Sequence, residues 1–506
     1  MFTGDMLLAD IVSTSNAVAA TRSRKAKVAA LAECLGAATR NELPVVTAYL
    51  SGSLLQRRTG LGWRSLTALP PPAAEASLTV SEVHEAFERM SRLSGSGSQV
   101  ARAAEADALF GAATTAEQVW LRAVVTGEVR QGALDSLVQE ALAVAAGVPL
   151  PAVRRAAMLA GSTVVVAGLA FDGEEALADV GLVVGRPVLP MLASSAGSVE
   201  EAMAKLGEPV VVDTKLDGIR IQAHKSGSEV RIATRTLEDI TARLPEVAEI
   251  VASFPADTLV LDGEAMTVGP DGRPRPFQET ASRTATRSAA DAVVSPYFFD
   301  ILHVDGRDLI DVALDQRLAE LDRIVPERHR SPRLVTVDTE AAEQFATDVL
   351  SAGHEGVVVK GVGLPWEAGR RGSGWIKVKP VHTLDLVVIG IEWGSGRRKG
   401  WLSNIHLGAR GPDGFVMIGK TFKGMTDQML AWQTERFTEL ALTDPHSDWA
   451  VQVRPEQVVE IAFDGVQRST RYPGGVALRF ARVVRYRDDK TAAEADTIET
   501  VQRFLD

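Results

Sequence analysis

A lysine in a charged turn is the strongest chemical signal in this sequence of 506 residues. The segment 215–220 reads Lys-Leu-Asp-Gly-Ile-Arg and follows the apolar run Val210–Val212, which predicts a short buried strand. Burial at the end of such a strand lowers the pKa of an amine, and a neutral amine can attack a phosphoryl group. Lys215 is therefore a candidate nucleophile. A surface Lys-Asp pair at a turn is the more common explanation of so short a motif.

Two glutamates stand beside glycines at the ends of predicted strands. Glu264 closes the segment Leu-Asp-Gly-Glu at 261–264, and Glu355 opens Glu-Gly-Val-Val-Val-Lys at 355–360. Two such carboxylates suit a hydrated Mg²⁺ ion held against a triphosphate, and Mn²⁺ is an alternative metal. Taken separately, each glutamate is more often an ordinary acid of a turn.

Basic residues gather in two places further along the chain. The segment 375–379 alternates as Trp-Ile-Lys-Val-Lys, which predicts a strand with Lys377 and Lys379 on one face, suited to a phosphate. A solvated edge strand is the ordinary alternative. The stretch 468–490 carries seven basic and two acidic residues, and Arg485, Arg487 and Lys490 lie at its end.

The patterns around these residues predict three kinds of structure. Residues 1 to about 195 are predicted to be helical, with capping boxes at Thr79–Glu82 and Thr114–Glu117. The middle region mixes strands, including Tyr297–Leu302, with helices such as Thr339–Ser351, which is an α+β pattern. After Pro380 the pattern is mostly β, with a long final strand at Leu478–Tyr486 and one helix at 426–440. Five short strands with an inserted helix suggest a small OB-type barrel.

Composition limits the class of protein. The single cysteine, Cys34, excludes an internal disulfide and a cysteine-based zinc module, and it fits a reducing cytoplasm. The sequence lacks a signal peptide and a membrane-spanning apolar run, so we expect a soluble, cytoplasmic protein without a membrane partner. The net charge of −11 disfavours a protein coated in nucleic acid, although local basic clusters can still bind phosphates.

Six motifs, taken in order, resemble those of the ATP-dependent DNA ligase family: KLDGIR, LDGEAM, FFDIL, EGVVVK, WIKVK and RYRDDK. One motif is weak evidence, whereas six in the family's order are very specific. The segments 49–52, 130–132 and 186–192 look like the family's helical DNA-binding domain, and 458–463 and 477–480 look like its OB domain. The length and plan are similar to the three-domain, B-type ligases of mycobacteria. The resemblance implies a helical DNA-binding domain at 1–195, an adenylation (nucleotidyltransferase) domain at 196–381 and an OB-fold domain at 382–506.

The resemblance also implies roles for individual residues. Lys215 matches the lysine that carries AMP, Asp213 a residue that helps to bind adenine, and Phe299 the ring that stacks on it. The remaining matches are nucleotide or 5′-phosphate contacts (Arg220, Arg235, Arg371), metal or ribose carboxylates (Glu264, Glu355), α-phosphate lysines (Lys377, Lys379), and the last motif, which orients pyrophosphate (Arg485, Arg487, Lys490). Ala481 departs from the family's usual proline, which removes a backbone restraint but no charge.

The implied reaction is nick sealing in double-stranded DNA by a monomer. Lys215 takes AMP from ATP and passes the AMP to the 5′-phosphate at the nick. The 3′-hydroxyl then displaces AMP and closes the backbone. This activity implies roles in DNA replication, repair and recombination. An NAD-dependent ligase would need a cysteine zinc site. An RNA ligase or GTP-using capping enzyme shares the lysine but normally lacks so long a helical domain. A catalytically silent DNA-binding scaffold would have lost Lys215 or both glutamates, and all three are present.

Overall fold

The computed structural model describes residues 5–56, 58–129, 131, 135–269, 273–275, 279–280, 294–367 and 371–505, apart from the side chains of 371–373 and 397. The chain forms two compact units, an N-terminal unit (Met1–Val378) and a C-terminal unit (Lys379–Asp506). The division expected near residue 195 falls inside the N-terminal unit.

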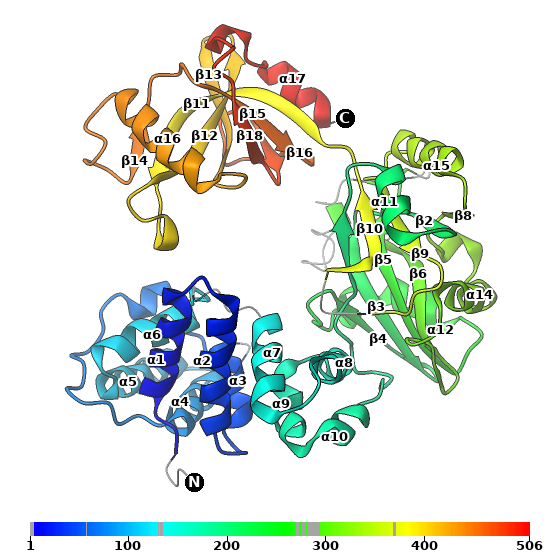
Figure 1. Cartoon of the computed structure of the whole chain (residues 1–506), viewed down its shortest axis with the longest axis horizontal. Coiled ribbons are helices and arrows are strands. Elements are labelled where there is room, and N and C mark those ends of the chain that lie inside the picture. The colour runs from blue at the N-terminus through cyan, green and yellow to red at the C-terminus, as the bar shows by residue number, and fades with distance from the viewer. Residues whose placement is uncertain are drawn as a thin grey trace. The chain divides into compact units, whose positions relative to one another are not determined.

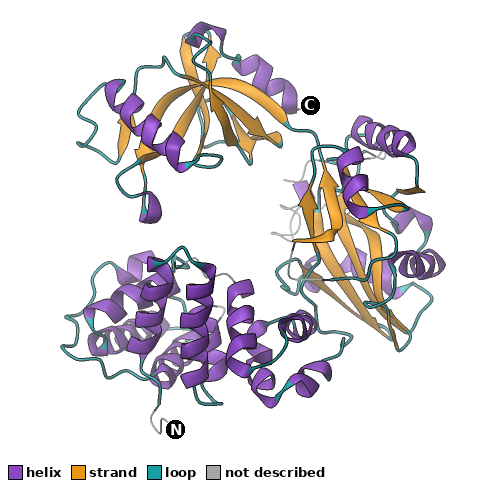
Figure 2. Ribbon diagram, viewed as in Figure 1, coloured by secondary structure: helices purple, strands orange, loops and turns teal. Residues whose placement is uncertain are grey.

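The first part of the N-terminal unit is helical (Figures 1 and 2). Its helices are α1 (Leu8–Ala20), α2 (Arg24–Ala37), α3 (Leu43–Leu50), α4 (Val80–Arg92), α5 (Ser98–Ala112), α6 (Thr115–Val125), α7 (Asp135–Ala146), α8 (Leu150–Ala160), α9 (Thr163–Asp172) and α10 (Glu174–Ala178). One continuous apolar core, from Met6 to Leu177, joins them.

Both predicted capping boxes are present. The Thr79 hydroxyl accepts a hydrogen bond from the Glu82 amide, and the Glu82 carboxylate accepts one from the Thr79 amide. Thr114 and Glu117 repeat this exchange at the start of α6. Each box satisfies amides that the first turn of a helix would otherwise leave unpaired.

Among the described residues, the rest of the N-terminal unit contains two five-stranded sheets and the helices that cover them. The first has the order β1-β10-β9-β2-β8, and the second β4-β3-β5-β6-β7. The strands are β1 (Leu192–Ser195), β2 (Val210–Thr214), β3 (Ile219–Ser226), β4 (Glu229–Thr234), β5 (Thr258–Thr267), β6 (Val294–Val304), β7 (Arg307–Asp308), β8 (Arg333–Thr336), β9 (Val357–Gly361) and β10 (Arg371–Val378).

Helices cover these sheets on their apolar faces. Val210 and Val212 of β2 pack with α11 (Val199–Leu206) and α15 (Thr339–Ser351), whereas Val211 joins the core of the second sheet. That second core also holds α12 (Pro245–Ala252) and α14 (Leu314–Ile324). Alternate residues of β2 therefore face different cores, as the period of two in a strand requires.

The C-terminal unit is mostly β, as predicted. Its larger sheet runs β13-β12-β11-β15-β18, with β14 also paired to β11, and β16 and β17 form a separate hairpin. The strands are β11 (His382–Trp393), β12 (Leu402–Gly411), β13 (Gly414–Thr421), β14 (Ala450–Gln452), β15 (Val458–Phe463), β16 (Gly465–Arg468), β17 (Val476–Arg479) and β18 (Arg482–Tyr486). The helices are α16 (Asp427–Glu439) and α17 (Ile498–Gln502).

The prediction of one long strand from Leu478 to Tyr486 was wrong. The chain breaks between β17 and β18 at Phe480, whose φ of 56° lies in the left-handed region. A residue there cannot continue a pleated strand, so the two halves join different sheets.

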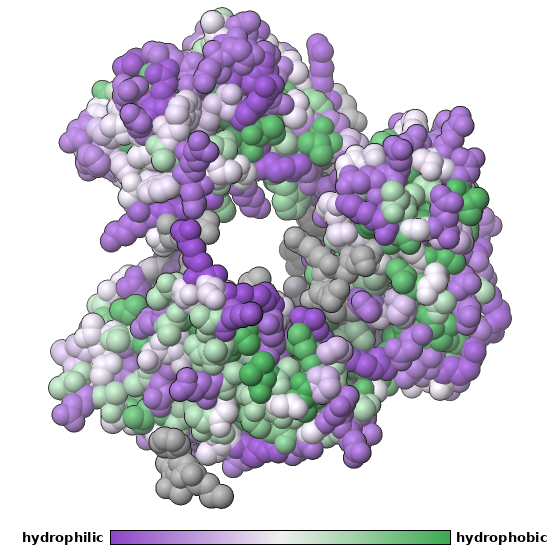
Figure 3. All heavy atoms as spheres, in the orientation of Figure 1, coloured by the Kyte–Doolittle hydropathy of each residue, from purple (hydrophilic) through white to green (hydrophobic). Residues whose placement is uncertain are grey.

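Among the described residues, no helix combines the length and apolarity needed to cross a bilayer. Hydrophilic side chains are interspersed with apolar ones on the face shown in Figure 3.

Candidate active site

Lys215 lies in the connection between β2 and β3, where its backbone is tied to a second motif. Its amide donates to the Gly356 carbonyl (2.8 Å), and its own carbonyl accepts from the Glu355 amide (3.3 Å). The Nζ of Lys215 contacts the Glu355 carboxylate, and the two side chains are 23% and 15% exposed. Lys215 and Glu355, which are 140 residues apart in the sequence, therefore form an ion pair that is partly exposed to solvent.

Glu264 lies on β5, opposite Arg220 of β3 in the strand register. Its Oε1 accepts a hydrogen bond from the amide of Gly218 (3.2 Å). Burial raises the pKa of Glu264 to about 8, while the charges of Lys215 and Arg220 oppose that rise. Without a ligand, this carboxyl is thus largely protonated near neutral pH, and a bound cation would favour its ionised form.

Gly218 allows this close approach. A Cβ at this position would lie 2.3 Å from the carbonyl oxygen of Ala265 and 2.9 Å from the Cβ of Met266. Because the nearest obstacle is backbone of β5, it cannot swing away as a flexible side chain would. The glycine between Lys215 and β3 is therefore required by sheet packing.

An aromatic pair lies between the sheets. Phe299 of β6 and Trp375 of β10 are 5.8 Å apart between ring centroids, with an angle of 82° between their planes. Lys360 Nζ lies 4.7 Å from the Phe299 centroid and 4.3 Å from that of Trp375. Arg220 lies 5.6 Å from both centroids. Phe299 as a whole residue is half-buried.

Asp213 on β2 forms an ion pair with Lys360 on β9. Burial raises the pKa of Asp213, and the charge of Lys360 opposes that rise. A role was predicted for Asp213 but none for Lys360, although this lysine ends the EGVVVK motif. Register explains the pairing, because Asp213 lies opposite Val358, two residues from Lys360 on the same face of β9.

Arg220 is held by the protein itself. Its Nε and Nη2 donate to the two oxygens of Asp262 (3.1 and 2.7 Å), and its Nη1 donates to the Met191 carbonyl (2.5 Å). Asp262 is fully buried. This bidentate pair gives Arg220 a fixed position beside the aromatic rings. No role for Asp262 was predicted from the sequence.

A second buried arginine supports the same strands. Arg317 of α14 donates through Nε and Nη2 to the oxygens of Asp300 (2.7 and 3.0 Å), and neither side chain is exposed. Asp300 lies opposite Asp262 in the register of β5 and β6. The two arginines thus compensate adjacent buried acids, which fixes these strands next to Phe299.

The other predicted phosphate-contacting residues lie in different settings. Lys377 is half-buried on β10, and Arg235 is exposed in the turn after β4. Arg371 begins β10, but its side chain lies outside the described residues, as do Arg130 and Gly132 of an earlier motif. The prediction that Lys379 shares the strand was wrong, because β10 ends at Val378 and Lys379 pairs with Asp464 in the C-terminal unit.

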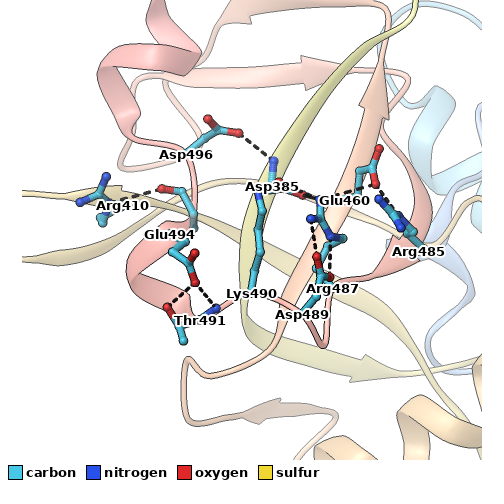
Figure 4. Close-up of polar contacts among 11 residues, drawn as sticks. Asp385, Arg410, Glu460, Arg485, Arg487, Asp489, Lys490, Thr491, Glu494 and Asp496 are labelled. Carbon is cyan, nitrogen blue, oxygen red and sulfur yellow. Dashed lines mark hydrogen bonds and ion pairs between the residues drawn. The ribbon is translucent and has the colours of Figure 1, made fainter.

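The last motif belongs to the C-terminal unit, where acids surround it (Figure 4). Arg485 donates to Glu460 (2.7 Å), and Arg487 makes two bonds to Asp489 (2.8 and 2.6 Å). Arg487 also donates to Asp385 (3.2 and 3.1 Å), as does Lys490 (2.6 Å). No motif predicted a role for Asp385.

The carboxylates near Lys215 fit a hydrated Mg²⁺ ion. Glu355 contacts Nζ, and Glu264 is close enough for the lysine charge to affect its pKa. No group of three or more candidate ligands occurs among the residues the structure describes. Mg²⁺ usually binds one or two carboxylates and keeps water and phosphate oxygens as its other ligands, which matches this set.

The N-terminal unit thus holds a half-buried lysine in contact with one glutamate and near a second, together with an aromatic pair that takes one ring from each sheet. Comparisons with known proteins show the family. The family models "ATP dependent DNA ligase domain", "ATP dependent DNA ligase C terminal region" and "DNA ligase N terminus" match residues 190–379, 398–490 and 64–143.

Curated relatives extend the match over the full chain. A "Probable DNA ligase" of Nocardioides sp. is 66% identical over 510 residues, covering 99% of both chains. One from Kineococcus radiotolerans is 66% identical, covering 98% of this chain and 99% of its own. The solved structure "Pmar-Lig_PreS3" matches with a TM-score of 0.62 and 16% identity over 94% of this chain and 99% of its own, which shows similarity of fold. The chain belongs to the ATP-dependent DNA ligase family.

Proposed function

We propose that Lys215 is the residue that carries AMP and that the protein uses it to seal nicks in duplex DNA. The observation that supports this proposal is the position of Lys215 at the end of a buried strand, in contact with Glu355 and close to Glu264. A lysine in a surface turn, the competing explanation of the motif, would not be tied by its backbone to a second carboxylate-bearing segment.

The adenine would bind between Phe299 and Asp213. Phe299, a half-buried residue, offers a ring for stacking, and a carboxylate can accept a hydrogen bond from the amino group of adenine. Arg220 lies at fixed distance from the ring and is already bonded to Asp262, so its first role is to hold the pocket's shape. Lys377, Lys379, Arg235 and Arg371 are the proposed phosphate contacts.

For the first step, Nζ of Lys215 must give up a proton, through the Glu355 carboxylate that it contacts to solvent water, and turn toward the α-phosphorus of ATP. The new N–P bond forms as the bond to pyrophosphate breaks in line with it. Lys377 would offset the charge that develops on the α-phosphate oxygens, and Lys379 would do so once it leaves Asp464. Glu264 and Glu355 would hold Mg²⁺, or Mn²⁺, which neutralises charge on the triphosphate when bound.

The three-part organisation would serve DNA binding. We propose that residues 1–195 form a DNA-binding domain, 196–381 the adenylation domain, and 382–506 an OB-type domain that acts as a lid. Lid closure would bring Arg485, Arg487 and Lys490 to the pyrophosphate, and reopening would expose lysyl-AMP to the nick. Contacts to DNA phosphates would carry little sequence information and would weaken with salt. We expect a cytoplasmic monomer.

Gel-resolved sealing of a nicked duplex tests the proposal. We expect sealing with ATP and Mg²⁺, no sealing with NAD, and faster sealing of a DNA strand than of an RNA strand. Sealing that requires NAD, or that occurs on RNA alone, would contradict it. Covalent labelling with α-labelled ATP, present in the wild type and absent in Lys215→Ala, tests the intermediate.

A further inference from the structure

Asp385 is the acid that the last two cations of the final motif share. Arg487 Nη1 lies 3.2 and 3.1 Å from its two oxygens, and Lys490 Nζ lies 2.6 Å from Oδ2. The Asp385 and Arg487 side chains are each 14% exposed, so this contact lies mostly out of solvent. One carboxylate thus holds two cations next to each other (Figure 4).

The backbone of Asp385 is itself fixed. Its amide donates to Oδ2 of Asp496 (2.8 Å), and its carbonyl accepts from the Asp496 amide (2.8 Å). On the other side, Asp385 of β11 lies opposite Glu460 of β15, the partner of Arg485. Asp385 therefore has a fixed position on a central strand, and its side chain binds the turn that follows β18.

Two other acids lie near Arg487. Glu460 of β15 has a carboxylate oxygen 3.9 Å from Arg487 Nη1, farther than either oxygen of Asp385, and it also pairs with Arg485. Asp489 differs in kind. Asp489 lies two residues away on the same turn, and its side chain is 62% exposed. Arg487 lowers the pKa of Asp489, but a pair within one turn moves together with that turn and cannot fix it to the sheet. Exposed pairs of this sort contribute little to rigidity.

We propose that Asp385 is a positioning residue for the last motif: it holds Arg487 and Lys490 as a preformed pair of cations for a diphosphate group. This inference rests on the proposed role of these two residues in binding pyrophosphate. Two cations held close together without a counter-charge repel each other, and flexible side chains lose entropy when a ligand orders them. A fixed carboxylate reduces both costs before the ligand arrives.

The test separates lysyl-AMP formation from later chemistry. In Asp385→Asn, we expect lysyl-AMP formation at saturating ATP to slow by about tenfold, because preorganised charges typically contribute an effect of this order or larger. The pyrophosphate concentration that half-maximally reverses adenylation should rise. Sealing of a nick that already carries AMP should change by less than about twofold, because that step uses no pyrophosphate. Asp413→Asn, an exposed acid in the turn between β12 and β13, is the matched control.

Arg487→Ala distinguishes failure of this inference from failure of the proposed function. If Arg487→Ala forms lysyl-AMP at the wild-type rate, the proposed role of the last motif fails. If Arg487→Ala is slow but Asp385→Asn is not, only the role of Asp385 fails. If Asp385 acts through the two cations, adding Asp385→Asn to the double variant Arg487→Ala/Lys490→Ala should have little further effect. If Asp385→Asn does not fold, Asp385→Glu can replace it, because glutamate keeps the negative charge but moves it. We expect Asp385→Glu to slow lysyl-AMP formation alone. Equal losses in lysyl-AMP formation and in sealing of a nick that already carries AMP would overturn the inference.

Discussion

Asp213 and Lys360 form an ion pair in which each side chain is at most 3% exposed, on adjacent strands of the sheet that carries Trp375. Lys360 also lies within 4.7 Å of the ring centroids of Phe299 and Trp375. A charge buried this deeply needs its partner. The proposed adenine pocket therefore depends on a residue that has no proposed contact with ATP.

Replacing Lys360 should destabilise the protein strongly. Lys360→Met leaves the Asp213 carboxylate buried without a counter-charge, so we expect the free energy of unfolding to fall by about 3–5 kcal/mol. Urea unfolding followed by circular dichroism measures the change. Because the double variant Asp213→Asn/Lys360→Met removes both charges, it should recover most of the loss.

Lys25→Met is a suitable control for the Lys360 variant, since Lys25 is an exposed lysine on α2. It should unfold at nearly the wild-type urea concentration. An equally small effect of Lys360→Met would show that the buried pair contributes nothing to stability.

Gly218→Ala should disable adenylation without removing any functional group. Its Cβ would lie 2.3 Å from the Ala265 carbonyl oxygen, so the Lys215 turn must move away from Glu264. Misplacement by about 1 Å can cost roughly a hundredfold in rate, and we expect a loss of that order in lysyl-AMP formation. Single-turnover labelling with α-labelled ATP measures it.

Gly36→Ala offers the comparison for that variant. Gly36 lies in α2, and a Cβ added there would meet no atom within 4 Å, so alanine should be tolerated and adenylation should be unchanged. Wild-type labelling by Gly218→Ala would mean that the close approach of β3 and β5 does not position Lys215.

Glu264 should make stability depend on pH. Burial raises its pKa in the folded protein to about 8, from 4.5 for the exposed group. A carboxyl with a raised folded-state pKa binds more protons when folded, so stability falls as pH rises from about 4.5 to about 8. Glu264→Gln cannot ionise, and relative to this variant the wild type should lose stability over that window.

Urea unfolding at pH 5.5 and pH 8.5, without ATP or metal, measures this difference between wild type and Glu264→Gln. At pH 8.5 the unfolding free energy of the wild type, relative to that of Glu264→Gln, should be lower than at pH 5.5. Parallel changes in the two proteins would contradict a buried, protonated Glu264.

The sequence predicts a site residue when the residue lies in a recognisable motif, and it fails when the role of the residue depends on a partner far away in the chain. Lys215 and Glu355 lie just outside strands, whereas Glu264 lies inside β5 beside Gly263, so the prediction that Glu264 stands at a strand end was wrong. The order of six motifs, rather than any one local pattern, led to the selection of these three residues. Lys360 and Asp385 were missed because each acts on a residue far away in the chain. Lys360 and Asp213 are 147 residues apart and meet through strand register. Asp385 and Arg487 are 102 residues apart and meet because the turn after β18 is bonded to β11.

Strand boundaries were missed for similar reasons. The run Leu478–Tyr486 alternates well enough to predict one strand, but the left-handed backbone of Phe480 divides it between two sheets. Likewise, Lys379 continues the alternation of Lys377, yet β10 ends one residue earlier and Lys379 pairs with Asp464. Period alone does not show where a strand changes partner.

Mapping the adenylated residue by mass spectrometry tests the central claim most directly. After incubation with ATP and Mg²⁺ and before addition of DNA, the peptide that contains Lys215 should carry one AMP on that side chain, and nicked DNA should remove it. AMP on another lysine such as Lys360 or Lys377, or a wild-type protein that never acquires AMP, would contradict the account.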